Sequence, residues 1–272
     1  MNNSFQGQYF FGESALTKMA MVIKSYRKSH PSCKSLFENQ DATILLKDEQ
    51  KLKYLNESYS IADLIDSPPI DIEKIALSFG IPNSGNFSIF DSSLQIVETA
   101  SDTSKLFHKL VNTIMPINIA QDSKMTSGVG FSLQKYKGTV FLSEPQIPEN
   151  QVIQLAISLA HELGHQALMV YQIADTIIEK EELNKTIYSH ARKCNRPAIQ
   201  AFHACVAISF MSYFLEELEI QRFNESERDF ILTKKNELNC ALKESVNLFF
   251  ETNFTELGKH LHLELIVYAN SI

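Results

Sequence analysis

The motif HELGH at positions 161–165 constrains this chain most, because it puts three polar side chains in the middle of an apolar segment. The residues around it, VIQLAISLA before and QALMV after, predict a long helix from about 148 to 171. Two histidines four residues apart lie on one face of a helix, one turn apart, so both imidazoles can reach the same metal ion. Because burying these groups without a partner is costly, we expect His161 and His165 to bind a metal.

Glu162 follows the first of these histidines, where a carboxylate can orient or deprotonate a metal-bound water. The whole pattern, H-E-x-x-H, is typical of zinc hydrolases. The longer pattern of metzincins, with a Gly and a third His after the motif, is absent, since Leu168 and Tyr171 occupy those positions. The remaining ligand must therefore come from another part of the chain.

His203, in the apolar segment RPAIQAFHACVAISFMSYF, is the favoured candidate for the third ligand. A single histidine on an apolar helix is usually a core residue, but a chain with two ligands already in place needs a third. A following acidic segment, IIEKEEL, offers the alternatives Glu179, Glu181 and Glu182. A cluster of this kind is more typical of a solvated charged surface than of a metal site.

Arg196 lies seven residues before His203, in a second long apolar helix that we expect to run from Arg196-Pro197 to about residue 222. Seven residues are about two helical turns, so both side chains would share a face, roughly 10 Å apart along the axis. A small dicarboxylate could chelate the metal at one end and pair with the guanidinium at the other. Arg192 is a second candidate anchor. The alternative, that Arg196 caps a loop or pairs with an acidic neighbour, stays open.

The remaining pattern indicates an α+β, mostly α fold. Alternating apolar and small or polar residues predict β-strands at 116–120, 128–134 and 138–144. Further helices are expected at 13–29, 71–79, 103–115, 173–185, 225–250 and 255–269, with a loop at 81–93. We therefore expect a small β-sheet beside a zincin-like HExxH helix and several long helices. Residues 1–272 would form a single catalytic domain, with a motif-bearing core at about 116–222 and a helical C-terminal part at 223–272.

The composition excludes several partners. The formal net charge of −7 is spread along the 272 residues, so a basic surface for nucleic acid is not expected. None of the four cysteines forms a C-x-x-C pair, which is typical of a reduced, intracellular protein. The N-terminal residues lack the pattern of a signal peptide, and the longest apolar segments carry His or Glu. We expect a cytoplasmic protein without a membrane partner.

Four motifs in order give the chain a resemblance to a known family. The segments GVGFSLQKYKGTVFLSE, AHELGHQ, YSHAR and RPAIQAFHA resemble the HExxH-motif peptide-modification proteins of ribosomal peptide natural product pathways. That family's pattern is a strand ending in Ser, an H-E-x-x-H helix, a Y-S-x-x-R segment and an R-P-x-x-x-x-x-H helix. The matching residues are Ser143, His161, Glu162, His165, Tyr188, Ser189, Arg192, Arg196, Pro197 and His203. The resemblance covers about residues 127–215, a third of the chain.

The resemblance implies oxidation rather than proteolysis. Members of the family are understood as iron(II)- and 2-oxoglutarate-dependent oxygenases that hydroxylate side-chain carbons of a precursor peptide. By resemblance, iron would be bound by His161, His165 and His203. The distal carboxylate of 2-oxoglutarate would be held by Arg196, with Arg192 as a second anchor. Glu162 would lie beside the ligands without binding the iron.

Two other functions stay open. A zinc metallopeptidase would use His161 and His165 as ligands and Glu162 as the general base. A peptide-binding module with a structural metal would bind the ion without turnover. The most familiar iron oxygenase site has two histidines and one carboxylate, so three histidines would be a variant of it. The oxygenase is favoured because of Arg196 and the family resemblance.

Overall fold

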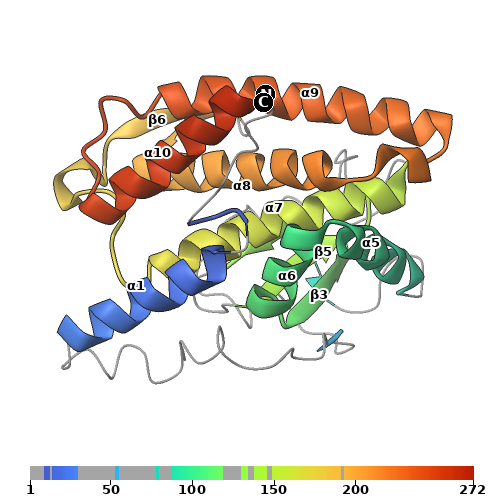
Figure 1. Cartoon of the computed structure of the whole chain (residues 1–272), viewed down its shortest axis with the longest axis horizontal. Coiled ribbons are helices and arrows are strands. Elements are labelled where there is room, and N and C mark those ends of the chain that lie inside the picture. Colours follow the sequence, from blue (N-terminus) through green and yellow to red (C-terminus); the bar gives the residue numbers. More distant parts are fainter. Residues whose placement is uncertain are drawn as a thin grey trace.

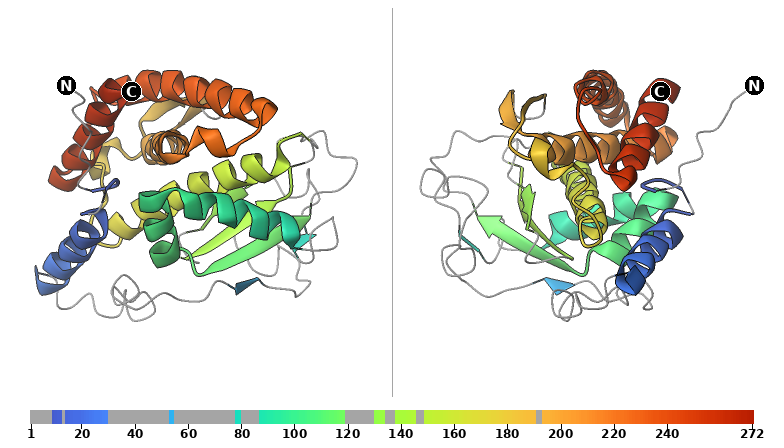
Figure 2. Two further views of the ribbon diagram at one scale, coloured as in Figure 1. Left: turned by 45° about the vertical axis from the view of Figure 1, so that its right-hand side comes forward. Right: turned by 90° about the vertical axis from the view of Figure 1, so that its left-hand side faces the viewer.

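Two apolar helices form the centre of the protein. The computed structural model describes residues 9–12, 14–29, 53–54, 78–79, 87–118, 130–133, 138–145, 149–190 and 193–272. Helix α7 (Gln151–Tyr171) carries the HELGH motif and packs along helix α8 (Ala198–Glu217). Figures 1 and 2 show the sheet on one side of this pair and the C-terminal helices on the other. The sequence-based expectation of an α+β, mostly α fold is confirmed.

Helices α7 and α8 approach closely because Gly164 faces Ala207. A Cβ atom added to Gly164 would lie 2.9 Å from the Ala207 Cα atom and 3.2 Å from the Phe210 Cβ atom. Helix α8 is also long and apolar enough to cross a membrane by length and composition. However, 72% of its most apolar window is buried inside the protein, as in a core helix.

The main sheet has five strands in the described part of the chain: β1 (Lys53–Tyr54), β2 (Ser78–Phe79), β3 (Thr113–Asn118), β4 (Gly130–Ser132) and β5 (Thr139–Ser143). Its order is β1-β3-β5-β4, and β2 also pairs with β3. Strand β3 runs parallel to β1 and β5, whereas β4 runs antiparallel to β5. Strand β5 is buried almost throughout, as its apolar sequence TVFLS predicts, and both β4 and β5 contact α7. The sheet therefore lies directly against the HELGH helix.

The other helices cover this core. Helices α5 (Ser88–Thr99) and α6 (Ser101–Leu110) pack on α7. Helix α9 (Glu225–Asn247), which begins with a capping box of Asn224 and Glu227, packs on α8. Helix α10 (Glu256–Ser271) packs on α9, and α1 (Ala15–Ser29) packs on α7. Two short 3-10 helices, η4 (Lys180–Glu182) and η5 (Ile220–Arg222), and the hairpin of β6 (Thr186–Ser189) and β7 (Cys194–Pro197) complete the described elements.

The N-terminal segment is held by a buried carboxylate of α10. Glu264 accepts hydrogen bonds from the backbone N–H groups of Tyr9, Phe10 and Phe11 at 2.6, 3.2 and 3.4 Å. The Tyr171 hydroxyl, at the end of α7, donates to the Tyr9 carbonyl oxygen. These bonds tie the beginning of the chain to its C-terminal helix and to the helix that carries the motif.

Several boundaries differ from the sequence-based predictions. The helix expected at 173–185 is wrong: Asp175 accepts from the Ile177 N–H, Ile177 has a positive φ of 69°, and the chain turns into η4 and β6. The helix expected at 103–115 ends at Leu110, and its last residues belong to β3. The segment expected as a loop at 81–93 contains the start of α5. Of the helix expected at 71–79, Ser78–Phe79 form β2 and the rest lies outside the described residues.

Candidate metal centre

His161 and His165 project from one face of α7 with their ring nitrogens in contact. Their Nε2 atoms are 3.1 Å apart, and the rings meet edge to face with centroids 4.8 Å apart. Two imidazole nitrogens that bind one ion at about 2.1 Å are separated by about 3.0 Å at a right angle and about 3.4 Å at a tetrahedral angle. The pair therefore has the spacing of two neighbouring ligands on one ion. Together with Glu162, they form a group that could hold a metal ion, with ligand atoms within 4.8 Å of one another.

Glu162 is fixed by strand β4. Its side chain is 1% exposed, and its Oε2 atom accepts a 2.7 Å hydrogen bond from the Ser132 hydroxyl. A Cβ atom added to Gly130, two residues earlier on the same strand, would lie 2.8 Å from Glu162 Oε1. The same oxygen is 3.9 Å from the Nε2 atom of His161. The carboxylate thus lies between the strand and the first histidine, where it can influence a group bound beside that histidine.

His203 of α8 lies next to the pair, but on the other side of His165. Its Nδ1 atom is 3.3 Å from the Nδ1 atom of His165, and its Nε2 atom is 3.0 Å from the Oε1 atom of Gln172. The four side chains therefore form a row: His161, His165, His203 and Gln172. The two nitrogens of one imidazole point in different directions, so a single ion bound by all three histidines requires rotation of a ring. His203 as the third ligand stays a prediction, because it lies beside the group that could hold a metal and not within it.

The protonation of His203 suits metal binding. Burial, and then the positive charge of Arg196, lower the pKa of His203 to about 4. The imidazole is therefore neutral at physiological pH, which is the form that binds metals.

Arg196 is near His203, but the reason given from the sequence is wrong. It belongs to strand β7 and is paired with Ile187 of β6, and α8 begins only at Ala198. Arg196 and His203 are therefore not on one helix, because pairing with β6 keeps the backbone extended through Pro197. Its charge nevertheless acts on His203. Arg192 lies outside the described residues.

The other described residues of the sequence motifs lie outside the group that could hold a metal. Ser143 is buried at the end of β5, and Ser189 is buried in β6 next to the exposed Tyr188. The acidic alternatives to His203 lie in and beside η4; Glu179 and Glu181 are exposed, and Glu182 pairs with Lys185. In the described part of the chain, these carboxylates are not in the group formed around the HELGH motif.

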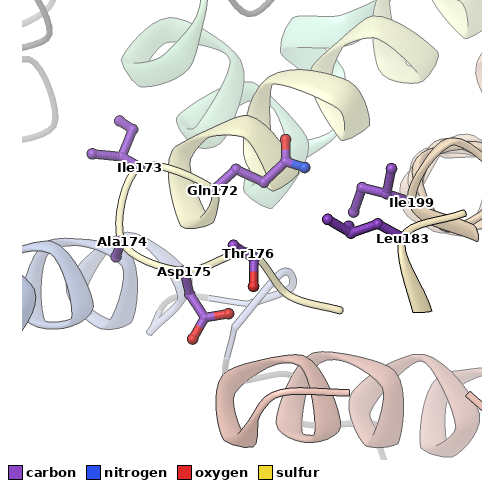
Figure 3. Close-up of a pocket in the computed structure, with 7 residues that line it drawn as sticks. All are labelled: Gln172, Ile173, Ala174, Asp175, Thr176, Leu183 and Ile199. Carbon is purple, nitrogen blue, oxygen red and sulfur yellow. The ribbon is translucent and has the colours of Figure 1, made fainter. Parts of the chain in front are cut away.

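A pocket opens next to His203 at the C-terminal end of α7 (Figure 3). Its volume is about 480 Å³, and it is lined by Gln172, Ile173, Ala174, Asp175, Thr176, Leu183 and Ile199. The carboxamide of Gln172 extends from α7 towards Ile199 and Leu183. Because Gln172 also contacts His203, the pocket and the row of histidines share a side chain.

Sequence reasoning missed two residues of the site, Ser132 and Gln172. A signal existed for each. Gln172 follows His165 by seven residues, which is about two helical turns and places both on one face. Ser132 follows Gly130 by two residues, so both face the same side of strand β4.

A search of models of known protein families and a search of curated proteins found no match for the chain. The chemistry of the site therefore rests on its own side chains. Two histidines with the spacing of neighbouring ligands and a buried carboxylate beside them could hold a metal ion and act on a group bound to it. His203 lies next to this group as the predicted further ligand.

Proposed function

We propose that the protein is an iron(II)- and 2-oxoglutarate-dependent oxygenase that hydroxylates a side-chain carbon of a ribosomally made precursor peptide in the cytoplasm. The observation that carries this proposal is the position of His203. This neutral imidazole lies 3.3 Å from His165 and within the field of Arg196. This position brings the predicted metal ligands close to a cation that could hold a carboxylate.

The donor set fits ferrous iron. Imidazole nitrogens suit iron as well as zinc, and three of them on one side of an octahedral ion leave three positions for other ligands. The 3.1 Å separation of the His161 and His165 Nε2 atoms lies between the values for a right angle and a tetrahedral angle, so it suits octahedral iron as well as tetrahedral zinc. Iron with 2-oxoglutarate and dioxygen supplies the oxidising power for hydroxylation; the side chains of this protein orient the reactants and exclude water.

Arg196 supports the choice of a dicarboxylate cosubstrate. A guanidinium forms two parallel hydrogen bonds with a carboxylate, which fixes both its position and its orientation. With one carboxylate on Arg196, the keto acid end of 2-oxoglutarate would bind the ion. Its influence on the pKa of His203 supports this placement.

The pocket beside His203 supports a peptide side chain as the group that reacts. Leu183 and Ile199 provide an apolar wall, whereas Gln172 and Thr176 provide hydrogen-bonding groups opposite them (Figure 3). A residue of an extended peptide could place an apolar side chain against this wall and its polar backbone against the hydrogen-bonding groups. We infer that the peptide enters from this side of the metal.

A zinc metallopeptidase is the second candidate, because Glu162 lies beside His161. With an Oε1 to Nε2 distance of 3.9 Å, the carboxylate is close to where the general base of a metallopeptidase acts. The hydrogen bond from Ser132 would then orient this base. A peptide-binding module with a structural metal would bind the ion and show neither activity.

The conversion of 2-oxoglutarate to succinate separates these functions. Purified protein is loaded with Fe(II) or with Zn(II), and succinate is measured in air with and without 2-oxoglutarate. The oxygenase predicts succinate from the iron-loaded protein and none from the zinc-loaded protein. Peptide cleavage by the zinc-loaded protein, without succinate in either case, would support the metallopeptidase instead.

A further inference from the structure

Gln172 occupies a fixed place next to His203. It ends helix α7, and its backbone N–H group donates to the carbonyl oxygens of Leu168 and Val170. Its side chain leaves the helix on the face of His165 and meets His203 of α8 with a distance of 3.0 Å between Oε1 and Nε2. The contact therefore bridges the two central helices at the level of the metal centre.

This contact determines which nitrogen of His203 can bind a metal. With the Gln172 carboxamide in this orientation, its oxygen accepts a hydrogen bond from the ring, and the Nε2 atom of His203 carries the hydrogen. In the neutral ring the Nδ1 atom then keeps its lone pair, and this is the atom that faces His165. In the other tautomer, Nδ1 would carry the hydrogen and could not bind an ion.

We propose that Gln172 is a positioning residue of the metal centre, which holds His203 in the tautomer that leaves a lone pair on Nδ1, the atom facing His165, so that Nδ1 is able to bind an ion. This inference rests on the part of the proposed function that makes His203 a ligand. Metal-binding histidines generally donate their second ring N–H to an acceptor, and loss of that acceptor typically weakens metal binding roughly 10–100-fold. Gln172 fills this role from a position that the sequence motifs do not include.

The pocket gives this contact a further consequence. The carboxamide of Gln172 lines the pocket, together with Ile199, which precedes His203 by one helical turn on α8. A peptide in the pocket contacts the same group that orients the ligand. A ligand in the pocket would therefore contact a side chain that also meets His203.

Optical titration of the metal-free protein with Co(II), in the absence of 2-oxoglutarate, tests the proposal. Cobalt replaces iron or zinc at such sites and absorbs visible light when bound. The variants are Gln172→Leu, which removes the acceptor, and Gln172→Glu, which keeps an acceptor at the same length. The matched control is Gln154→Leu, the same change on α7 at a residue that instead contacts the Glu149 carbonyl oxygen. His203→Ala alone and combined with Gln172→Leu completes a double-mutant cycle.

We expect Gln172→Leu to weaken Co(II) binding roughly 10–100-fold, and Gln172→Glu and Gln154→Leu to stay within a few-fold of the unmodified protein. In the His203→Ala background, Gln172→Leu should have no further effect. Equal losses in both backgrounds, equal losses in the two Gln172 variants, or no loss at all would overturn the proposal. Because no 2-oxoglutarate is present, this result is independent of whether the protein is an oxygenase.

Discussion

Ser132 donates a 2.7 Å hydrogen bond to the buried carboxylate of Glu162, so a residue of the sheet holds the glutamate of the HELGH motif. Replacement of Ser132 by Ala removes a donor from a buried acceptor, which typically costs about 1–3 kcal/mol. We expect the free energy of unfolding to fall by this amount in denaturant titrations. Co(II) binding should be nearly unchanged, because Ser132 contacts Glu162 and not the histidines. Loss of metal binding in this variant would instead make Glu162 itself a ligand.

The close approach of α7 and α8 at Gly164 gives a second prediction. Gly164→Ala places a methyl group 2.9 Å from the Ala207 Cα atom, and a backbone atom cannot move aside as a flexible side chain can. We expect a loss of about 1–3 kcal/mol of stability from overpacking, together with weaker metal binding, because the shift separates His203 from His165. Thermal unfolding and Co(II) titration measure both effects. An increase in stability, as helix propensity alone predicts, would show that the helices can separate without strain.

Arg196→Ala should raise the concentration of 2-oxoglutarate required for half-maximal binding roughly 10–100-fold, from the loss of about 1.5–3 kcal/mol of charge-assisted hydrogen bonding. Binding of the metal alone should be unchanged. The control is Arg222→Ala, which removes an arginine that pairs with Glu219 on the surface at 2.7 Å. Equal loss of metal and of 2-oxoglutarate in Arg196→Ala would assign the arginine a structural role.

The lowered pKa of His203 predicts how the stability of the metal-free protein depends on pH. The unfolded histidine titrates near 6.5 and the folded one at about 4, so the unfolded state binds more protons between these values. Stability should therefore fall as the pH is lowered through this window, by about 2 kcal/mol from His203 between pH 7 and pH 5. His203→Gln should reduce this dependence. Part of the pH dependence should remain in this variant, because burial also lowers the pKa of His262. If stability depends on pH in His203→Gln as it does in the unmodified protein, His203 is not the residue responsible.

The parts of the fold that the sequence predicts well are those with strong local patterns. The HELGH helix, the second apolar helix and strand β5 all have long or regular apolar patterns, and their existence is confirmed. Helix α5 was missed although Phe90, Leu94 and Val97 have helical spacing, because the Asn and Ser residues around them indicate a loop.

The errors occur where distant contacts override local preference. Pro197 favours the first turn of a helix, yet pairing of Arg196 with Ile187 delays the start of α8. The turn after α7 depends on Asp175, which accepts a 2.6 Å hydrogen bond from Thr255, eighty positions along the chain. No pattern within a short window reports such a contact.

The same contrast between local patterns and distant contacts holds for the candidate site. The spacing of His161, Glu162 and His165 within one helix predicts a group that could hold a metal, which the structure confirms. The contacts of Ser132 and Gln172 depend on how β4 and α8 pack against α7, so their roles emerge only from the three-dimensional arrangement. The metal, the cosubstrate and the peptide stay predictions that experiment must test.

The most direct test of the central claim is an anaerobic titration of the metal-free protein with Fe(II) and then with 2-oxoglutarate. A keto acid chelated to ferrous iron gives a visible charge-transfer band. We predict that this band forms in the unmodified protein and disappears in His203→Ala. Absence of the band, together with tight zinc binding, would contradict the oxygenase and favour a metallopeptidase.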